Sequence, residues 1–178
     1  MSNITNGQNT NLPKFSKEEI TLIGIVLLLT LMDSVRYDSR LISHMFEEAV
    51  HSLPGINEGK PFDIKRLMEK VSKLDYHELV KTFEKNVKHI VLPDFSEDER
   101  CILANCICST ILNGMFIQSL DATVYDYIYY NMLPSGKSDL SEANKAFVSK
   151  VKSLSYIQRV KLIYMIECEF FKKAESEE

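Results

Sequence analysis

The side chains best suited to metal chemistry lie between positions 44 and 51, where histidines and glutamates recur at helical spacing. They are His44, Glu47, Glu48 and His51. A histidine and a carboxylate three or four residues apart on one helix can share a metal ion. However, the apolar residues of the same segment fall on the other side of the predicted helix: Leu41, Ile42, Met45, Phe46, Ala49, Val50 and Leu53. Because helical bundles build metal sites from inward-facing ligands, we interpret the four polar residues as a solvated surface and predict no metal site.

Three cysteines, Cys101, Cys106 and Cys108, stand close together in a second apolar stretch, and Cys168 lies apart. Their spacing is not that of a Cys-x-x-Cys zinc knuckle, and no histidine lies near them in sequence. Cysteine often behaves as a small apolar residue in a protein interior. We therefore predict that the three cysteines pack in the core and do no thiol or zinc chemistry.

The segment Leu133–Ser138, with the sequence LPSGKS, resembles the end of a phosphate-binding loop. The first glycine of that motif would fall at Asn131, and no strand is predicted before it. A turn between two helices is the better interpretation. With no convergent set of histidines, cysteines and carboxylates in apolar surroundings, we predict that the chain is not an enzyme and binds no cofactor.

Two apolar stretches, Phe15–Met32 and Phe95–Leu112, organise the rest of the chain. Each begins with a capping box, Ser16 with Glu19 and Ser96 with Glu99, in which the two side chains satisfy free amides at a helix start. Beyond the cap neither stretch has a clear polar face, which is typical of a helix buried on all sides. The apolar run is shorter than the roughly 20 residues that a bilayer span requires, so we predict no stable membrane insertion.

The two stretches belong to a repeat with an offset of 80 residues. Further pairs in the same register are Thr30 with Thr110, Leu53-Pro54 with Leu133-Pro134, Lys70-Val71 with Lys150-Val151, and Tyr76 with Tyr156. We predict an all-α fold of eight helices, built by tandem duplication of a four-helix unit with pseudo-twofold symmetry.

The repeat also predicts the domain organisation. Residues 1–14 form a disordered tail, 15–92 the first repeat, 93–173 the second repeat packed on the first as one domain, and 174–178 an acidic tail. The two apolar helices should pack against each other, since Gly24 and its counterpart Ala104 are small enough for a close crossing.

Composition restricts the function classes. Charged residues make up 26% and apolar residues 45% of the chain, and the net charge is −4. Acidic residues are interleaved with the basic ones between positions 63 and 88, so no nucleic-acid surface of a single sign is predicted. No signal peptide or lipidation motif opens the sequence, which favours a cytoplasmic protein.

Two departures from the repeat are candidate sites. Asn105 stands where the first half has Ile25 and, if buried, needs hydrogen-bond partners, so it predicts an internal polar site. In the predicted helix Ser119–Leu133, Val124, Tyr127, Ile128 and Asn131 replace the polar His44, Glu47, Glu48 and His51. Either another helix of the chain covers this face, or it binds a partner.

We expect a non-enzymatic interaction or regulatory protein that presents Val124, Tyr127, Ile128 and Tyr130 to a protein partner or to a second copy. The alternative is a ligand-sensing domain that holds an apolar molecule or lipid between the two halves, near Asn105. The first hairpin of each half also resembles the helical units of tellurite-resistance TerB-type domains, through Asp33-Ser34 and Asn113-Gly114, which follow the apolar helices. The acidic cluster that this resemblance implies after the dipeptide is not evident here.

Overall fold

The computed structural model describes residues 13–32, 45–46, 49–50, 62–108 and 114–176. Every regular element in these ranges is a helix, and none of these residues forms a strand, which confirms the all-α prediction. The helices are α1 (Lys17–Met32), α3 (Ile64–Val71), α4 (Tyr76–Val87), α5 (Glu97–Cys108), α6 (Gly114–Gln118), α7 (Leu120–Asn131), α8 (Glu142–Lys152) and α9 (Tyr156–Ser176).

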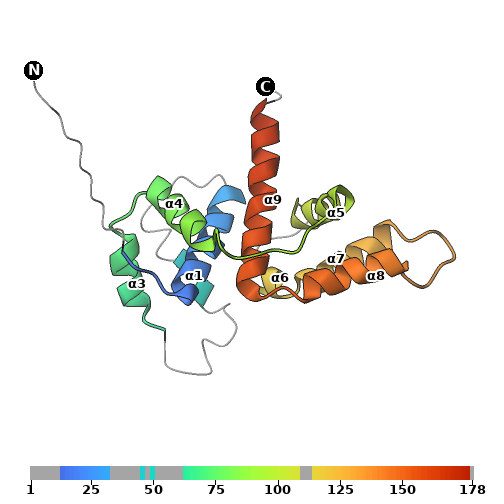
Figure 1. The fold of residues 1–178 in the computed structure, drawn as a ribbon, viewed down its shortest axis with the longest axis horizontal. Helices are drawn as coiled ribbons and strands as arrows, with labels where there is room; N and C mark the ends of the chain where they lie inside the picture. Colours follow the sequence, from blue (N-terminus) through green and yellow to red (C-terminus); the bar gives the residue numbers. More distant parts are fainter. Residues whose placement is uncertain (1–12, 33–44, 47–48, 51–61, 109–113, 177–178) are drawn as a thin grey trace, which may run out of the picture.

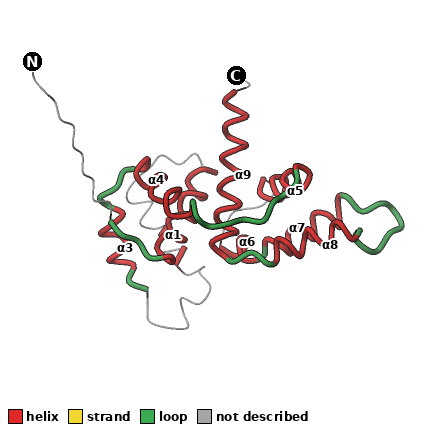
Figure 2. Tube along the Cα trace, in the orientation of Figure 1, coloured by secondary structure: helices red, strands yellow, loops and turns green. Residues whose placement is uncertain are grey.

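Helix α9 stands in the middle of the molecule, with α1, α3 and α4 to one side and α5 to α8 to the other (Figure 1). It packs against α1, α5 and α6, while α1 also contacts α4, and α5 also contacts α7. Helices α7 and α8 lie side by side (Figure 2). The expectation that the two apolar helices pack mainly on each other is therefore wrong: α1 and α5 each pack on α9.

Helix α1 is enclosed as its composition predicts. Every apolar side chain from Ile20 to Leu28 is buried, in contact with the single hydrophobic core of the described residues. Gly24 allows this close packing, since a Cβ at that position would lie 2.4 Å from Phe83 Cε2 and 2.6 Å from Val160 Cγ1. The small residue therefore serves a crossing, but the crossing elements are α4 and α9, not α5.

Helix α5 is only partly enclosed, unlike α1. Ile102, Leu103, Ala104, Cys106 and Ile107 are buried, whereas Cys101, Asn105 and Cys108 form an exposed stripe. These three positions are four and three residues apart and so share one face of the helix. The prediction of three core cysteines is thus wrong for Cys101 and Cys108, because α9 and α7 do not cover that face.

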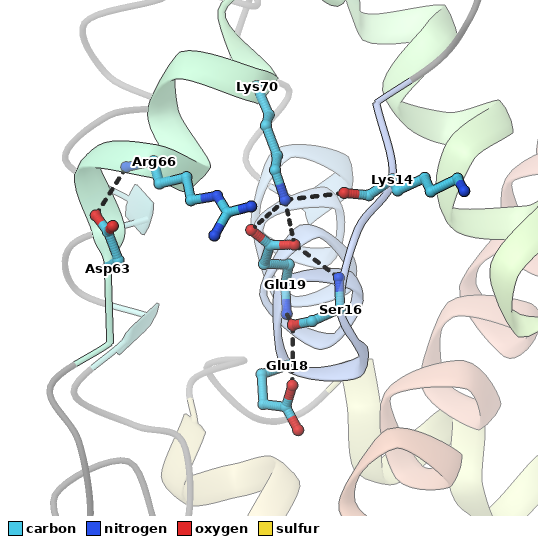
Figure 3. A network of polar contacts seen from close by, with 7 residues as sticks. All are labelled: Lys14, Ser16, Glu18, Glu19, Asp63, Arg66 and Lys70. Atoms are coloured by element: carbon cyan, nitrogen blue, oxygen red, sulfur yellow. Dashed lines mark hydrogen bonds and ion pairs between the residues drawn. The ribbon is translucent and has the colours of Figure 1, made fainter.

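The capping box at the start of α1 is linked to α3 by one lysine (Figure 3). The Glu19 carboxylate accepts a hydrogen bond from the Ser16 amide at 2.6 Å, and the Ser16 hydroxyl accepts one from the Glu19 amide. Lys70 Nζ donates to both Glu19 carboxylate oxygens at 2.7 Å and to the Lys14 carbonyl at 2.9 Å. The same ammonium group lies 5.2 Å from the centre of the Phe15 ring.

The second half contains a matching set of contacts. Lys150 Nζ donates to the Glu99 carboxylate oxygens at 2.8 and 2.7 Å and to the Asp94 carbonyl at 2.9 Å. It lies 5.0 Å from the centre of the Phe95 ring. Ser96 and Glu99 form the reciprocal cap. Each residue of this set stands eighty positions after its counterpart. Residues that the sequence repeat aligns therefore make the same contacts in both halves.

Other expected elements are modified or lie outside the described residues. The structure adds the short helix α6, and α9 continues into the predicted acidic tail as far as Ser176. Most of the predicted helix that carries His44 and His51 falls outside, although Phe46 and Ala49 are helical and buried. The predicted tail at 1–12 also falls outside. No helix among the described residues has the length and apolar character needed to cross a bilayer.

Candidate functional site

The face of α7 that was expected to meet a partner is turned inward at two of its residues. Val124 and Ile128 are 0% exposed and lie in the core with Leu120. The prediction is wrong for these two residues because α5 and α8 both pack on α7, with α8 running along its length. Coverage by the chain's own helices, one of the alternatives that the sequence left open, is therefore found for Val124 and Ile128, whereas Tyr127 on the same face is half-buried and Asn131 is exposed.

A neighbouring face of α7 carries an aromatic surface, which we call the tyrosine ridge: Tyr125, Tyr129 and Tyr130. The rings of Tyr125 and Tyr129 are stacked with centres 6.0 Å apart, and the Tyr130 ring meets Tyr129 edge-on at 5.2 Å. Tyr130 is 79% exposed. A ring–ring cluster held at the surface is ordered before any partner arrives, and tyrosine is enriched in recognition surfaces.

The signal for this ridge is present in the sequence. Val124 and Ile128, four residues apart, define one face, and Tyr125 and Tyr129 define another about 100° away. Aliphatic side chains have no polar group to keep in water, whereas tyrosine accepts both burial and exposure. Given two such faces, the aliphatic one is the better core, and the expectation for Tyr130 as a surface residue agrees with its exposure.

A groove of about 480 Å³ lies between α5, α7 and α8. It brings together Asn105 and Tyr127, two of the residues singled out from the sequence. Its lining consists of Ser96, Asp98, Glu99, Cys101, Ile102, Asn105, Tyr127, Met132, Ala143, Asn144 and Phe147. We call it the α5–α7–α8 groove.

Asn105 lies at the surface in this groove, so the prediction that it marks an internal polar site is wrong. Its Nδ2 donates to the Cys101 carbonyl at 2.9 Å, within its own helix. This bond holds the amide against α5, where the side chain meets the groove beside Tyr127, which is half-buried. The groove therefore combines an amide with an aromatic ring.

The groove is apolar on one side and acidic at one end. Phe147 is buried and packs edge-on against Phe95, with ring centres 6.2 Å apart. Asp98 and Glu99 lie at the capped end of α5, where Glu99 pairs with Lys150 at 2.7 Å. An apolar wall beside amide and hydroxyl groups is suited to binding a peptide segment by shape and hydrogen bonds.

A second opening lies at the junction of the two halves. A cleft of about 550 Å³ is formed by the starts of α1 and α9 and the end of α4. Its lining consists of Phe15, Ser16, Lys17, Ile20, Asn86, His89, Ile90, Ser155, Ile157 and Gln158. We expected a ligand cavity between the two halves to lie near Asn105, but Asn105 does not line this cleft.

Metal chemistry is not evident in the part of the chain that the structure describes, where no three histidine, cysteine or acidic side chains are grouped as metal ligands. His44, Glu47, Glu48 and His51 lie outside the described residues. Among the cysteines, burial raises the pKa of the Cys106 thiol to about 12, which keeps it protonated and unreactive.

Comparison with protein-family models, with curated proteins and with solved structures gives no match. Of the residues that carry the resemblance to tellurite-resistance domains, Asp33, Ser34 and Asn113 lie outside the described residues. Gly114 is the first residue of α6.

Proposed function

We propose that this chain is a non-enzymatic interaction protein that binds a segment of a partner protein in the α5–α7–α8 groove. The observation that carries the proposal is the convergence of Asn105 and Tyr127 on that groove. Tyr130 and the rest of the tyrosine ridge lie on the same helix and would extend the contact beyond the groove. The partner is a protein, and the chain acts by recognition.

The chemistry of the lining supports a peptide occupant. An apolar side chain of the partner would rest against Met132 and Phe147, where water is displaced from apolar surface. The Asn105 and Asn144 amides would exchange hydrogen bonds with the partner's main chain, as polar groups at an interface commonly do. Aromatic anchors surrounded by adaptable polar groups account for most binding energy in such interfaces.

The experiment is a peptide-display selection against the full chain, followed by affinity measurement on two matched variants. Ala143→Arg places a long side chain in the groove, whereas Ala146→Arg makes the same change at an exposed position of α8 outside it. We expect selected peptides to bind the Ala143→Arg variant at least about tenfold more weakly, a loss of about 1.4 kcal/mol. The Ala146→Arg variant should bind as the unmodified chain does. Equal binding to all three proteins would refute the proposal.

A second copy of the chain is the other partner that the ridge could meet. Light scattering coupled to size exclusion measures this directly through molar mass. A dimer that becomes monomeric on Tyr130→Ala would identify self-association, and a monomer at all concentrations would leave a different protein as the partner. Either result identifies the kind of partner that the ridge meets. Neither result changes the outcome expected from the peptide-binding test of the groove.

We place the protein in the cytoplasm, and the cysteines support this. Within the described residues none of the four forms a disulfide, and two of them, Cys101 and Cys108, are exposed. Exposed thiols persist in a reducing compartment and are oxidised outside it. Fractionation of the source cells, followed by detection of the chain, checks the location.

We also propose that the two halves derive from a tandem duplication and are related by an approximate twofold axis. The support is the recurrence of the Lys70–Glu19 and Lys150–Glu99 contacts at an offset of eighty residues. Superposing an experimentally determined structure on itself in that register tests the idea. If α1 cannot be aligned on α5 while α3 falls on α8 and α4 on the start of α9, the duplication is rejected.

A second candidate function is the sensing of a small molecule in the cleft where α1, α4 and α9 meet. Its volume of about 550 Å³ lies within the range of ligand pockets, and residues of both halves line it. Native mass spectrometry of the purified chain is the test. A bound small molecule that is lost on Ile157→Arg would favour this function over the peptide groove.

A further inference from the structure

A second groove, on another side of the molecule, has a different chemistry. It lies between α4 and α9, has a volume of about 540 Å³, and does not share a residue with the α5–α7–α8 groove. Its lining consists of Lys81, Glu84, Lys85, Val87, Lys88, Lys161, Tyr164 and Met165. We call it the lysine groove.

The lysine groove has a charge opposite to that of the whole chain. Four lysines and one glutamate give it a formal charge of +3, while the chain carries −4. Lys81, Lys85 and Lys88 are exposed and form no ion pair with any residue that the structure describes. Their charge is therefore available to an anionic partner.

The remaining two charges of the groove are already engaged. The Glu84 carboxylate accepts a hydrogen bond from the Tyr164 hydroxyl at 3.1 Å, which holds it against α9. Lys161 Nζ donates to the Ile90 carbonyl at 2.6 Å, which ties α9 to the end of α4. These contacts hold the two walls of the groove in place. The row of lysines on α4 is the part of the groove whose charge is available for binding.

The floor between the charged edges is apolar. Val87 and Tyr164 are buried, and Met165 is 43% exposed. Methionine is a flexible apolar side chain that adapts to different partners. The lysine row spans about 10 Å along the α4 axis, because helical residues rise about 1.5 Å each. The site is thus a short basic edge beside a small apolar floor.

We propose that the lysine groove binds an acidic polypeptide segment that places an apolar side chain on Met165. Charge complementarity selects the acidic residues, and the floor selects the apolar one. A nucleic acid is a poorer fit because single-stranded bases stack on exposed aromatic rings, and the aromatic residue here, Tyr164, is buried. A membrane surface is a poorer fit because it requires a broad apolar face instead of a bounded groove.

The test is fluorescence anisotropy with the full chain and a fluorescein-labelled peptide of sequence EELEELEELEE. The groove variant is Lys85→Glu/Lys88→Glu, and the matched control is Lys65→Glu/Lys73→Glu, which makes the same change in charge at exposed lysines outside the groove. We expect the groove variant to bind the peptide at least about tenfold more weakly and the control to change affinity less than about threefold. Circular dichroism of each variant verifies that it remains folded.

The other arms of the experiment separate the kinds of occupant. A peptide with glutamine in place of leucine should bind more weakly if the floor contributes, and Met165→Gln should remove that difference. Phosphatidylserine vesicles and a single-stranded oligonucleotide are titrated under the same conditions. An equal loss in the groove and control variants, or binding of vesicles or oligonucleotide but not of the acidic peptide, would overturn the proposal.

Discussion

The ammonium nitrogen of Lys70 lies 2.7 Å from both carboxylate oxygens of Glu19, which joins the start of α1 to α3. The Glu19 side chain is 9% exposed, so its charge is nearly enclosed. The same carboxylate also accepts from the Ser16 amide in the capping box. One acidic group therefore caps α1 and anchors α3 to it.

Replacing Lys70 with methionine should destabilise the chain, because the Glu19 charge would remain buried without its partner. Breaking such a pair by removing one member costs about 3 kcal/mol. Lys150→Met should cost less, roughly half as much, since Lys150 and Glu99 are more exposed to water. Urea unfolding monitored by circular dichroism measures both values.

Two controls make that result specific. Lys145→Met breaks an exposed pair with Glu142 and should leave the unfolding midpoint unchanged. Adding Glu19→Gln to Lys70→Met removes the buried charge and should recover part of the loss. A Lys70→Met chain as stable as the unmodified one would show that the ion pair contributes nothing to stability.

Gly24→Ala should destabilise the chain even though alanine favours helix formation. The added Cβ would stand 2.4 Å from Phe83 Cε2 and 2.6 Å from Val160 Cγ1. Overpacking of this kind costs about 1–3 kcal/mol, more than the gain of about 1 kcal/mol in helix propensity. Thermal unfolding of Gly24→Ala alone and with Val160→Ala measures the effect, and the double variant should be less perturbed than the sum of the two single variants. Strict additivity would argue against this contact.

Glu167 makes stability depend on pH. Its side chain is buried in α9, its Oε2 atom has no hydrogen-bond partner among the residues that the structure describes, and burial raises its pKa from 4.5 to about 7. Between these two pH values the folded chain keeps a proton that the unfolded chain releases. The contribution of Glu167 to the free energy of unfolding therefore falls as pH rises from 4.5 to 7 and stays low above 7.

The Glu167→Gln variant tests this sign. It cannot ionise, so it should gain stability relative to the unmodified chain as pH rises, by up to about 3 kcal/mol at pH 8. Urea unfolding at pH 5 and pH 8 gives the difference in the free energy of unfolding between the variant and the unmodified chain at each pH. Comparing the two differences cancels the contributions of other titrating groups. A difference that does not vary with pH would mean that Glu167 titrates normally.

The two faces of α7 should respond differently to truncation. Ile128→Ala removes a fully buried side chain and should cost about 2–4 kcal/mol of stability. Tyr130→Ala, at an exposed position, should change stability by less than about 0.5 kcal/mol. Measured together by urea unfolding, the pair separates folding from recognition. A large loss of stability from Tyr130→Ala would show that the Tyr130 side chain supports the fold and is not an exposed recognition residue.

The sequence predicts the parts of the fold that depend on local chemistry. Ser16 with Glu19 and Ser96 with Glu99 form the expected caps, because the bonds they make reach only three residues along the chain. The burial of α1 from Ile20 to Leu28 also follows, since these nine successive positions offer no polar face to water. Such features need no knowledge of the neighbouring helices.

Features that depend on long-range packing could not be predicted in the same way. A cysteine can be buried or exposed, so the sequence alone does not say where Cys101 and Cys108 lie. The positions of α7 and α9 decide it. Val124 and Ile128 seemed available because the first half has polar residues at their counterparts, yet α8 covers them. The sequence register equates residues between the halves and does not say which helix packs on each face.

The central position of α9 has a consequence for how the chain acquires its structure during synthesis. Helices α1 and α5 leave the ribosome before α9 exists, although both bury their apolar side chains against it. At the usual rate of translation, α9 is synthesised on the order of ten seconds after α1. A nascent chain interrupted before Tyr156 therefore exposes the α1 side chains that pack on α9 to chaperones and to other chains, and the completion of α9 ends this exposure.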